Sequence, residues 1–118
     1  MHDAVSHRRI HGSCHCGRVT LTLRETPPDR GECNCSICRR TGGLWHHCSP
    51  DKVAVEGKGV SYRQGDCTLD LWHCQTCGCT THWTPVDPAY PRMAVNLRMF
   101  EPSLWQALPT RFIDGASF

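Results

Sequence analysis

The sequence predicts a mainly β protein, built from small antiparallel sheets and tied together by bound metal. Short runs of alternating apolar and polar residues, separated by Gly, Pro and Asp, dominate the chain, and such runs are typical of strands joined by turns. Stretches with the helical period are scarce. Ten cysteines in 118 residues indicate crosslinks by disulfides or by metal. A chain of this length forms one domain with a modest core, which crosslinks help to stabilise.

Alternation places the earlier strands. Residues 19–23 read VTLTL and predict a strand. Residues 52–56 and 60–63 flank a Gly-Lys-Gly segment, and this pattern indicates a hairpin. Helix is expected only as single turns, at residues 36–41 and 102–105.

Further strands are expected in the second half of the chain. Residues 69–74 alternate, and residues 79–83 are expected to return beside them as an antiparallel partner. Met93, Val95 and Leu97 share one face of a later strand. Together these runs complete a mainly antiparallel β architecture.

The N-terminus suggests where the domain begins. Residues 1–11 contain no apolar run of signal-peptide length and are expected to form a flexible arm, leaving residues 12–118 as a single zinc-binding domain of catalytic type. No stretch approaches the roughly 20 apolar residues of a membrane span. These features predict a cytoplasmic protein without a membrane partner. In that reducing compartment, cysteines are expected to bind metal rather than to form disulfides.

The charge of the chain is mild. The formal net charge is +2, and the arginines are spread along the sequence rather than gathered in a run. Nucleic-acid binders usually show a denser basic surface with aromatic residues between the charges. A nucleic-acid partner is therefore not expected, whereas a small acidic ligand is compatible with this balance.

Seven of the cysteines fall into three clusters. Two short pairs lie in turn-like segments followed by Gly, which suits the tight knuckle that presents two thiolates to one zinc ion. A third cluster offers three thiolates from one short loop. The pairs are Cys14 with Cys16 and Cys74 with Cys77, and the trio is Cys33, Cys35 and Cys38.

The ligand count suggests two different zinc sites. The two pairs together make a closed four-thiolate site, which is typical of structural zinc. Three protein ligands with an open position are typical of catalytic zinc. The pair at residues 74–77 could instead be a redox motif, and the pair at residues 14–16 could be buried thiols.

The trio could also recruit a fourth protein ligand and become a second structural site. The candidates for that ligand are His46, His47, Cys48 and Cys79. The three remaining cysteines are more often packing residues than ligands in such chains. They are Cys48, Cys67 and Cys79.

The cysteine clusters resemble those of the glutathione-dependent formaldehyde-activating enzyme family, which also includes centromere protein V. The resemblance rests on GSCHCG at residues 12–17, CNCSICRR at residues 33–40 and CQTCG at residues 74–78. Two late segments, VNL at residues 95–97 and DGA at residues 114–116, are also similar. Three ordered clusters are specific, whereas any one of them alone would be a weak signal.

The resemblance implies a β-tent-like fold, two zinc ions and a reaction. The reaction is the reversible addition of glutathione to formaldehyde, which gives S-hydroxymethylglutathione and is carbon–sulfur lyase chemistry. By this resemblance the four paired cysteines hold the structural zinc and the trio holds the catalytic zinc. Asn34 stands where the family often carries His. Arg39 and Arg40 are candidate contacts to glutathione carboxylates, or solvated charges that balance the thiolates.

Two other functions remain open from the sequence. The chain could be a non-catalytic zinc-binding interaction module, because centromere protein V shows that this scaffold need not be an enzyme. It could also be a related enzyme that acts on another thiol adduct, since a fold does not determine a function.

Overall fold

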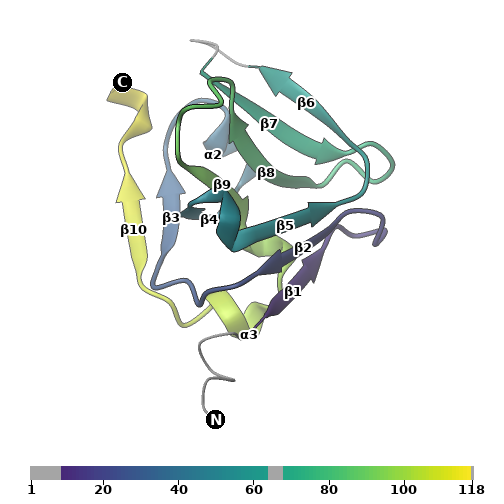
Figure 1. Ribbon diagram of the computed structural model, residues 1–118. Coiled ribbons are helices and arrows are strands. Elements are labelled where there is room, and N and C mark those ends of the chain that lie inside the picture. The colour runs from purple at the N-terminus through teal and green to yellow at the C-terminus, as the bar shows by residue number, and fades with distance from the viewer. Residues whose placement is uncertain (1–8, 64–67, 118) are drawn as a thin grey trace.

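The protein folds into two sheets that pack around a shared core (Figure 1). A computed structural model describes residues 9–63 and 68–117. The smaller sheet has the strand order β1-β2-β5, and the larger one has the order β10-β3-β4-β9-β8-β7-β6. In chain order, the strands are β1 (Ile10–Ser13), β2 (Thr20–Leu23), β3 (Arg30–Cys33), β4 (Trp45–Cys48), β5 (Val53–Glu56), β6 (Gly59–Arg63), β7 (Leu69–Cys74), β8 (Thr80–Pro85), β9 (Met93–Asn96) and β10 (Thr110–Ile113).

Helical structure is limited to single turns. Two α-helical turns, α2 (Cys38–Thr41) and α3 (Pro102–Trp105), lie within the expected helical segments. Three 3₁₀ turns are η1 (Pro50–Lys52), η2 (Leu97–Met99) and η3 (Gly115–Ser117). The prediction of a mainly β fold is confirmed. All strand pairs are antiparallel except β10 with β3, which run parallel.

The predicted hairpin between residues 52–56 and 60–63 is wrong. Both segments are strands, but β5 pairs with β2 in the smaller sheet and β6 pairs with β7 in the larger one. The chain turns from one sheet to the other at Gly57, whose φ is 108°. A Cβ at this position would clash with the carbonyl oxygen of Arg18. The Gly-Lys-Gly segment therefore marks a crossing between sheets.

The core lies between the smaller sheet and one face of the β4–β9 pair. Met93 and Val95 of β9 pack there with Leu21 and Leu23 of β2, and both leucines have no exposed surface. Leu97 joins the same cluster, so the predicted face of this strand is confirmed.

The opposite face of the β4–β9 pair is also covered. Ala94 packs there with Trp45 and Leu71, and the loop that carries Cys38 lies against them. Strand β9 is therefore buried on both sides. One face of its neighbour β4 consequently meets the core shared with the smaller sheet, and the other face meets the cluster around Trp45 and Leu71.

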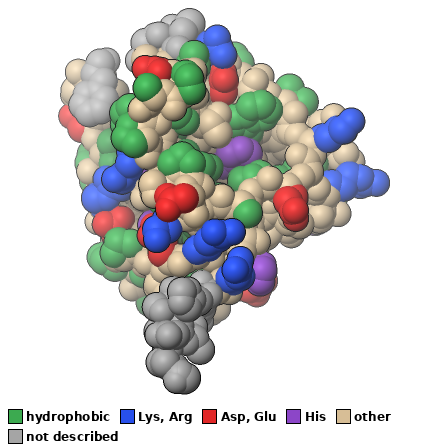
Figure 2. Space-filling model, in the orientation of Figure 1, with side chains coloured by type: hydrophobic (Ala, Val, Ile, Leu, Met, Phe, Trp, Pro, Cys, Tyr) green, Lys and Arg blue, Asp and Glu red, His purple; other side chains and the backbone are tan. Residues whose placement is uncertain are grey.

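The expected N-terminal arm falls mostly outside the described residues. Residues 1–8 lie there, whereas Ile10 and His11 belong to β1 and pair with β2. Over the described part of the chain, no helix has the length and apolarity needed to cross a membrane. On the face shown in Figure 2, basic and acidic side chains are interspersed.

Candidate metal centres

The two cysteine pairs meet at one point between the sheets. Cys14 and Cys16 lie in the connection from β1 to β2, whereas Cys74 ends β7 and Cys77 lies in the connection from β7 to β8. Their sulfur atoms all lie within 4.8 Å of one another. The Sγ atom of Cys16 is 3.6 Å from those of Cys14 and Cys74. Four sulfurs at about 2.3 Å from a tetrahedral zinc ion are about 3.8 Å apart, so this group is compatible with zinc.

The two connections have the same local structure. The backbone N–H of Cys14 donates to the carbonyl of Val19, and that of Cys74 donates to Cys79, both at 3.0 Å. Glycines with positive φ, at 82° for Gly17 and 81° for Gly78, complete the turns. Each turn thus presents its two sulfurs to the same side, as a zinc knuckle does.

Backbone donors stabilise thiolates in this four-cysteine group. The N–H groups of Cys79 and Cys16 lower the pKa of Cys77 to about 5. Backbone N–H groups of Cys77 and Thr76 lower the pKa of Cys74 as well. The cysteines of the described residues are all free thiols, so no disulfide competes for these sulfurs there. Burial raises the pKa of Cys14 instead, so Cys74 and Cys77 are the members of the group whose surroundings favour the thiolate that a metal ligand needs.

The trio forms a second, separate group. Cys33 ends β3, Cys35 follows in the loop, and Cys38 begins α2. Their sulfurs also lie within 4.8 Å of one another, and all three residues are half-buried. The backbone N–H of Cys38 donates to the Sγ atom of Cys35 at 3.4 Å. Gly42, with φ at 70°, ends the helical turn and closes the loop.

The electrostatics of the trio favour a bound cation. Burial raises the pKa of Cys38, and hydrogen bonding to Cys35 and the negative charges of Cys35 and Cys33 raise it further. The buried indole N–H of Trp45 has no hydrogen-bond partner, but Trp45 packs against Cys38 and opposes that rise in pKa. A cation would remove the repulsion among the three thiolates. The trio, too, is compatible with zinc.

The C-terminal segment fixes the trio loop. The amide of Asn34 donates to Asp114 at 2.9 Å, and its oxygen accepts from the N–H of Ala116 at 2.8 Å. Gly115 passes against the cysteines, where a Cβ would lie 2.5 Å from the Sγ atom of Cys33. Asn34 therefore anchors the loop, and the DGA segment contains glycine because the trio leaves no room for a side chain.

A cavity of about 290 Å³ opens beside the trio. Cys33 and Cys38 line it together with two arginines, Arg39 and Arg98, and one acidic residue, Glu32. Arg98 donates to the carbonyl of Gly42 at 2.5 Å and stacks over Trp105, 5.4 Å from the ring centre. Sequence reasoning missed Arg98, although it directly follows the VNL segment that carried part of the resemblance.

The other predicted arginine points elsewhere. Arg40 donates to the carbonyl of Ser36 at 2.7 Å and is not among the residues lining this cavity. The four-cysteine group and the trio are thus where the sequence suggested, and Arg39 is beside the trio.

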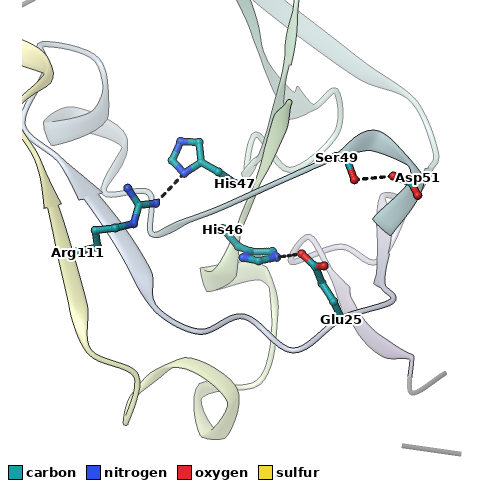
Figure 3. A network of polar contacts seen from close by, with 6 residues as sticks. All are labelled: Glu25, His46, His47, Ser49, Asp51 and Arg111. Atoms are coloured by element: carbon teal, nitrogen blue, oxygen red, sulfur yellow. Dashed lines mark hydrogen bonds and ion pairs between the residues drawn. The ribbon is translucent and has the colours of Figure 1, made fainter. Parts of the chain in front are cut away.

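No candidate fourth ligand joins the trio among residues 9–63 and 68–117. His46 and Cys48 lie with Glu25 on the other face of β4. His47 points the opposite way from His46 and accepts a hydrogen bond from Arg111 at 3.0 Å (Figure 3). Cys79 packs against the four-cysteine group, and Cys67 lies outside the described residues. The alternative in which one of them completes the trio is therefore not seen in the described part of the chain.

The fold and the clusters together define a small cysteine-rich β protein with two clusters of cysteine thiols, each suited to zinc. The sequence profile of the glutathione-dependent formaldehyde-activating enzyme family matches residues 9–111. The chain belongs to this family. Comparison with curated proteins gives no significant match. A similar solved structure, a crystal structure of a Rhodobacter sphaeroides protein from a structural genomics project, shares 30% identity, covers 86% of this chain and 100% of its own, and has a TM-score of 0.70.

Proposed function

We propose that the protein is a zinc-dependent carbon–sulfur lyase, which reversibly adds glutathione or a related thiol to formaldehyde to give S-hydroxymethylglutathione. The family indicates a function related to glutathione and formaldehyde activation. The observation that carries the finer proposal is the cavity that joins the trio to two guanidinium groups. A three-thiolate group beside two guanidinium groups, which outnumber the one carboxylate of the cavity, Glu32, suits a substrate that has both a thiol and carboxylates.

We propose two zinc ions with different tasks. The four-cysteine group, which links the two sheets, would hold a structural ion. Cys33, Cys35 and Cys38 would hold a catalytic ion that, when bound, supplies a position for the substrate sulfur and favours its thiolate form. The trio brings three negative charges to a divalent ion, so the loaded site favours thiol exchange over the activation of water.

The other residues position the substrate. In the forward direction a carbon–sulfur bond forms between thiol and formaldehyde, and the thiol proton ends on the former carbonyl oxygen. Arg39 and Arg98 would bind the carboxylates of glutathione and hold its sulfur toward the trio. Arg40 instead donates to the carbonyl of Ser36. We therefore assign the binding of the glutathione carboxylates to Arg39 and Arg98, the two arginines of the cavity.

The first test is the rate of adduct formation above the uncatalysed rate, measured by NMR exchange between free and adducted glutathione. Cys38→Ser is expected to remove the acceleration and to leave the circular dichroism spectrum unchanged. Loss of the fold in this variant would show instead that the trio is structural. Equal rates with and without the wild-type protein would leave a non-catalytic zinc module as the better description.

The second test concerns the thiol. Arg98→Gln is expected to reduce kcat/KM for glutathione roughly 10- to 100-fold, because a charge-assisted hydrogen bond contributes about 1.5–3 kcal/mol. The same variant should handle the uncharged thiol 2-mercaptoethanol like the wild type. Arg63→Gln is the matched control, since Arg63 pairs with Asp70 on β7 and does not line the cavity. Equal losses with both thiols would contradict carboxylate binding by Arg98.

A further inference from the structure

We propose that Glu25, His46 and Cys48 form a third metal site, which takes a divalent transition metal such as zinc on mixed oxygen, nitrogen and sulfur ligands. Their ligand atoms all lie within 4.8 Å of one another. This site is independent of the proposed reaction. It accounts for His46 and Cys48 of the WHHC segment, which belong neither to the four-cysteine group nor to the trio.

The strand geometry brings these side chains together. His46 and Cys48 are two residues apart on β4 and therefore point to the same face. That face packs against the smaller sheet, since Cys48 belongs to the core cluster formed with Leu21 and Leu23. Glu25 lies just beyond the end of β2, opposite His46. The site thus bridges the two sheets, on the face of β4 opposite to the trio.

The distances fit a tetrahedral ion with little movement. The Nε2 atom of His46 lies 2.7 Å from an Oε atom of Glu25 (Figure 3). Nitrogen and oxygen ligands at about 2.0–2.2 Å from zinc are about 3.4 Å apart, so the pair would need to separate by less than 1 Å. Glu25 can provide this movement, because its side chain is 35% exposed whereas that of His46 is 5% exposed.

The charges of the loaded site would balance. One thiolate, one carboxylate and a neutral imidazole cancel the two positive charges of the ion, which limits the cost of burying it. On binding, the Cys48 thiol loses its proton to solvent, and the proton on Nε2 of His46 moves to Nδ1 or to solvent. Glu25 and Asp51 bring negative charge near Cys48, and Arg92 brings positive charge.

One of the three ligands, His46, also lines a cavity of about 500 Å³. The cavity is also lined by Asp29, His47, Arg92 and Arg111, whereas Glu25 and Cys48 do not line it. Strands β3 and β4 pair only at Gly31 and Trp45, so they diverge beyond this point. Three protein ligands and an adjacent cavity leave a fourth position for water or a small ligand, as in catalytic zinc sites.

The experiment is metal counting on the full-length chain. The protein is saturated with Co²⁺, passed through a desalting column and measured by elemental analysis and by thiolate-to-cobalt charge-transfer absorption. His46→Ala and Glu25→Gln are each expected to bind one cobalt ion fewer than the wild type. His47→Ala is the matched control, because its ring lies on the other face of β4, and it should bind as much as the wild type.

The readout is a difference between variants, so it does not depend on the proposed reaction or on the number of ions at the other cysteines. Cys48→Ala should also lose one ion, together with its share of the charge-transfer absorption. If Cys48→Ala fails to fold, the surface variant Glu25→Gln still decides the question. Equal cobalt content in wild type, His46→Ala and Glu25→Gln would overturn the proposal and leave His46 and Glu25 as an ion pair.

Discussion

Replacing Gly57 by alanine should destabilise the protein far more than the same change at Gly78. Both glycines have positive φ, at 108° and 81°, and a left-handed conformation costs a non-glycine residue about 1–2 kcal/mol. At Gly78 nothing lies within 4 Å of an added Cβ, so this cost is the whole effect. At Gly57 the Cβ would meet the backbone carbonyl of Arg18.

The backbone must therefore move in the Gly57→Ala variant. Arg18 lies two residues before the start of β2, and the neighbouring pair is Thr20 with Glu56 in the β2–β5 ladder. Losing one or two of these hydrogen bonds adds about 0.5–1.5 kcal/mol each. With the positive-φ cost, the total is about 1.5–5 kcal/mol, a large share of the roughly 5–15 kcal/mol that stabilises a typical domain.

Urea unfolding of zinc-saturated protein, followed by tryptophan fluorescence, measures both variants against the wild type. We expect Gly57→Ala to lose about 0.5–3 kcal/mol more than Gly78→Ala, which is the contribution of the lost hydrogen bonds, with an unchanged slope in urea. Equal losses in the two variants would refute the reasoning, because the cost of positive φ alone would then account for the lost free energy of unfolding at Gly57. Such a result would also show that the crossing between the sheets tolerates a side chain.

Three further predictions concern buried polar groups and the metal. Asn96→Ala should lower the free energy of unfolding by about 3 kcal/mol, because the Asn96 side chain accepts from the N–H groups of Leu44 and Arg98 and donates to the carbonyl of Thr80. Asn96→Asp keeps only the acceptor role, so its stability in urea unfolding should lie between those of the wild type and Asn96→Ala. Burial lowers the pKa of His82 to about 4, so between pH 6.5 and 4 the unfolded chain binds more protons, and stability should fall by about 2 kcal/mol from pH 7 to pH 5. This fall should be smaller in His82→Gln when both proteins are unfolded in urea at each pH, and an equal fall would assign it to other groups. Removal of metal by a strong chelator should abolish the cooperative thermal transition, and in calorimetry Cys74→Ser should reproduce this loss whereas Cys38→Ser should not.

The sequence predicted the strands of this fold better than their partners. Alternation identified β5 and β6, and the glycines between them identified a bend. The bend was interpreted as a hairpin because local patterns carry no information about the sheet to which each strand belongs. In the structure, β5 completes the smaller sheet and β6 forms the edge of the larger one.

Strand β4 was not predicted, and its sequence pattern is atypical for a physical reason. Strand β4 reads WHHC and is covered on both faces, so it shows no alternation of apolar and polar residues. Once β4 is known to be a strand, the two-residue period assigns His46 and Cys48 to one face and His47 to the other. The signal for the Glu25 group was thus present in the sequence, but it required the strand assignment first.

The cysteine clusters were predictable because spacing alone places neighbouring thiols on one turn. Arg98 was not, because no local spacing relates it to a loop some 60 residues earlier in the chain. It reaches the cavity only because β9 lies beside β4 and leads into η2. Residues that line a site from distant strands depend on the topology, which the sequence pattern did not determine.

The two knuckles also bear on the order of events during folding. Each lies in the turn of a local antiparallel pair, β1–β2 or β7–β8, which can form within microseconds. Cys16 and Cys74 are 58 residues apart, and closing a loop of this length costs about 4 kcal/mol in chain entropy. An ion captured by one knuckle would therefore keep an incomplete ligand shell until the larger sheet has assembled. Completion of that shell would be a late step, which joins two halves of the chain that have already folded.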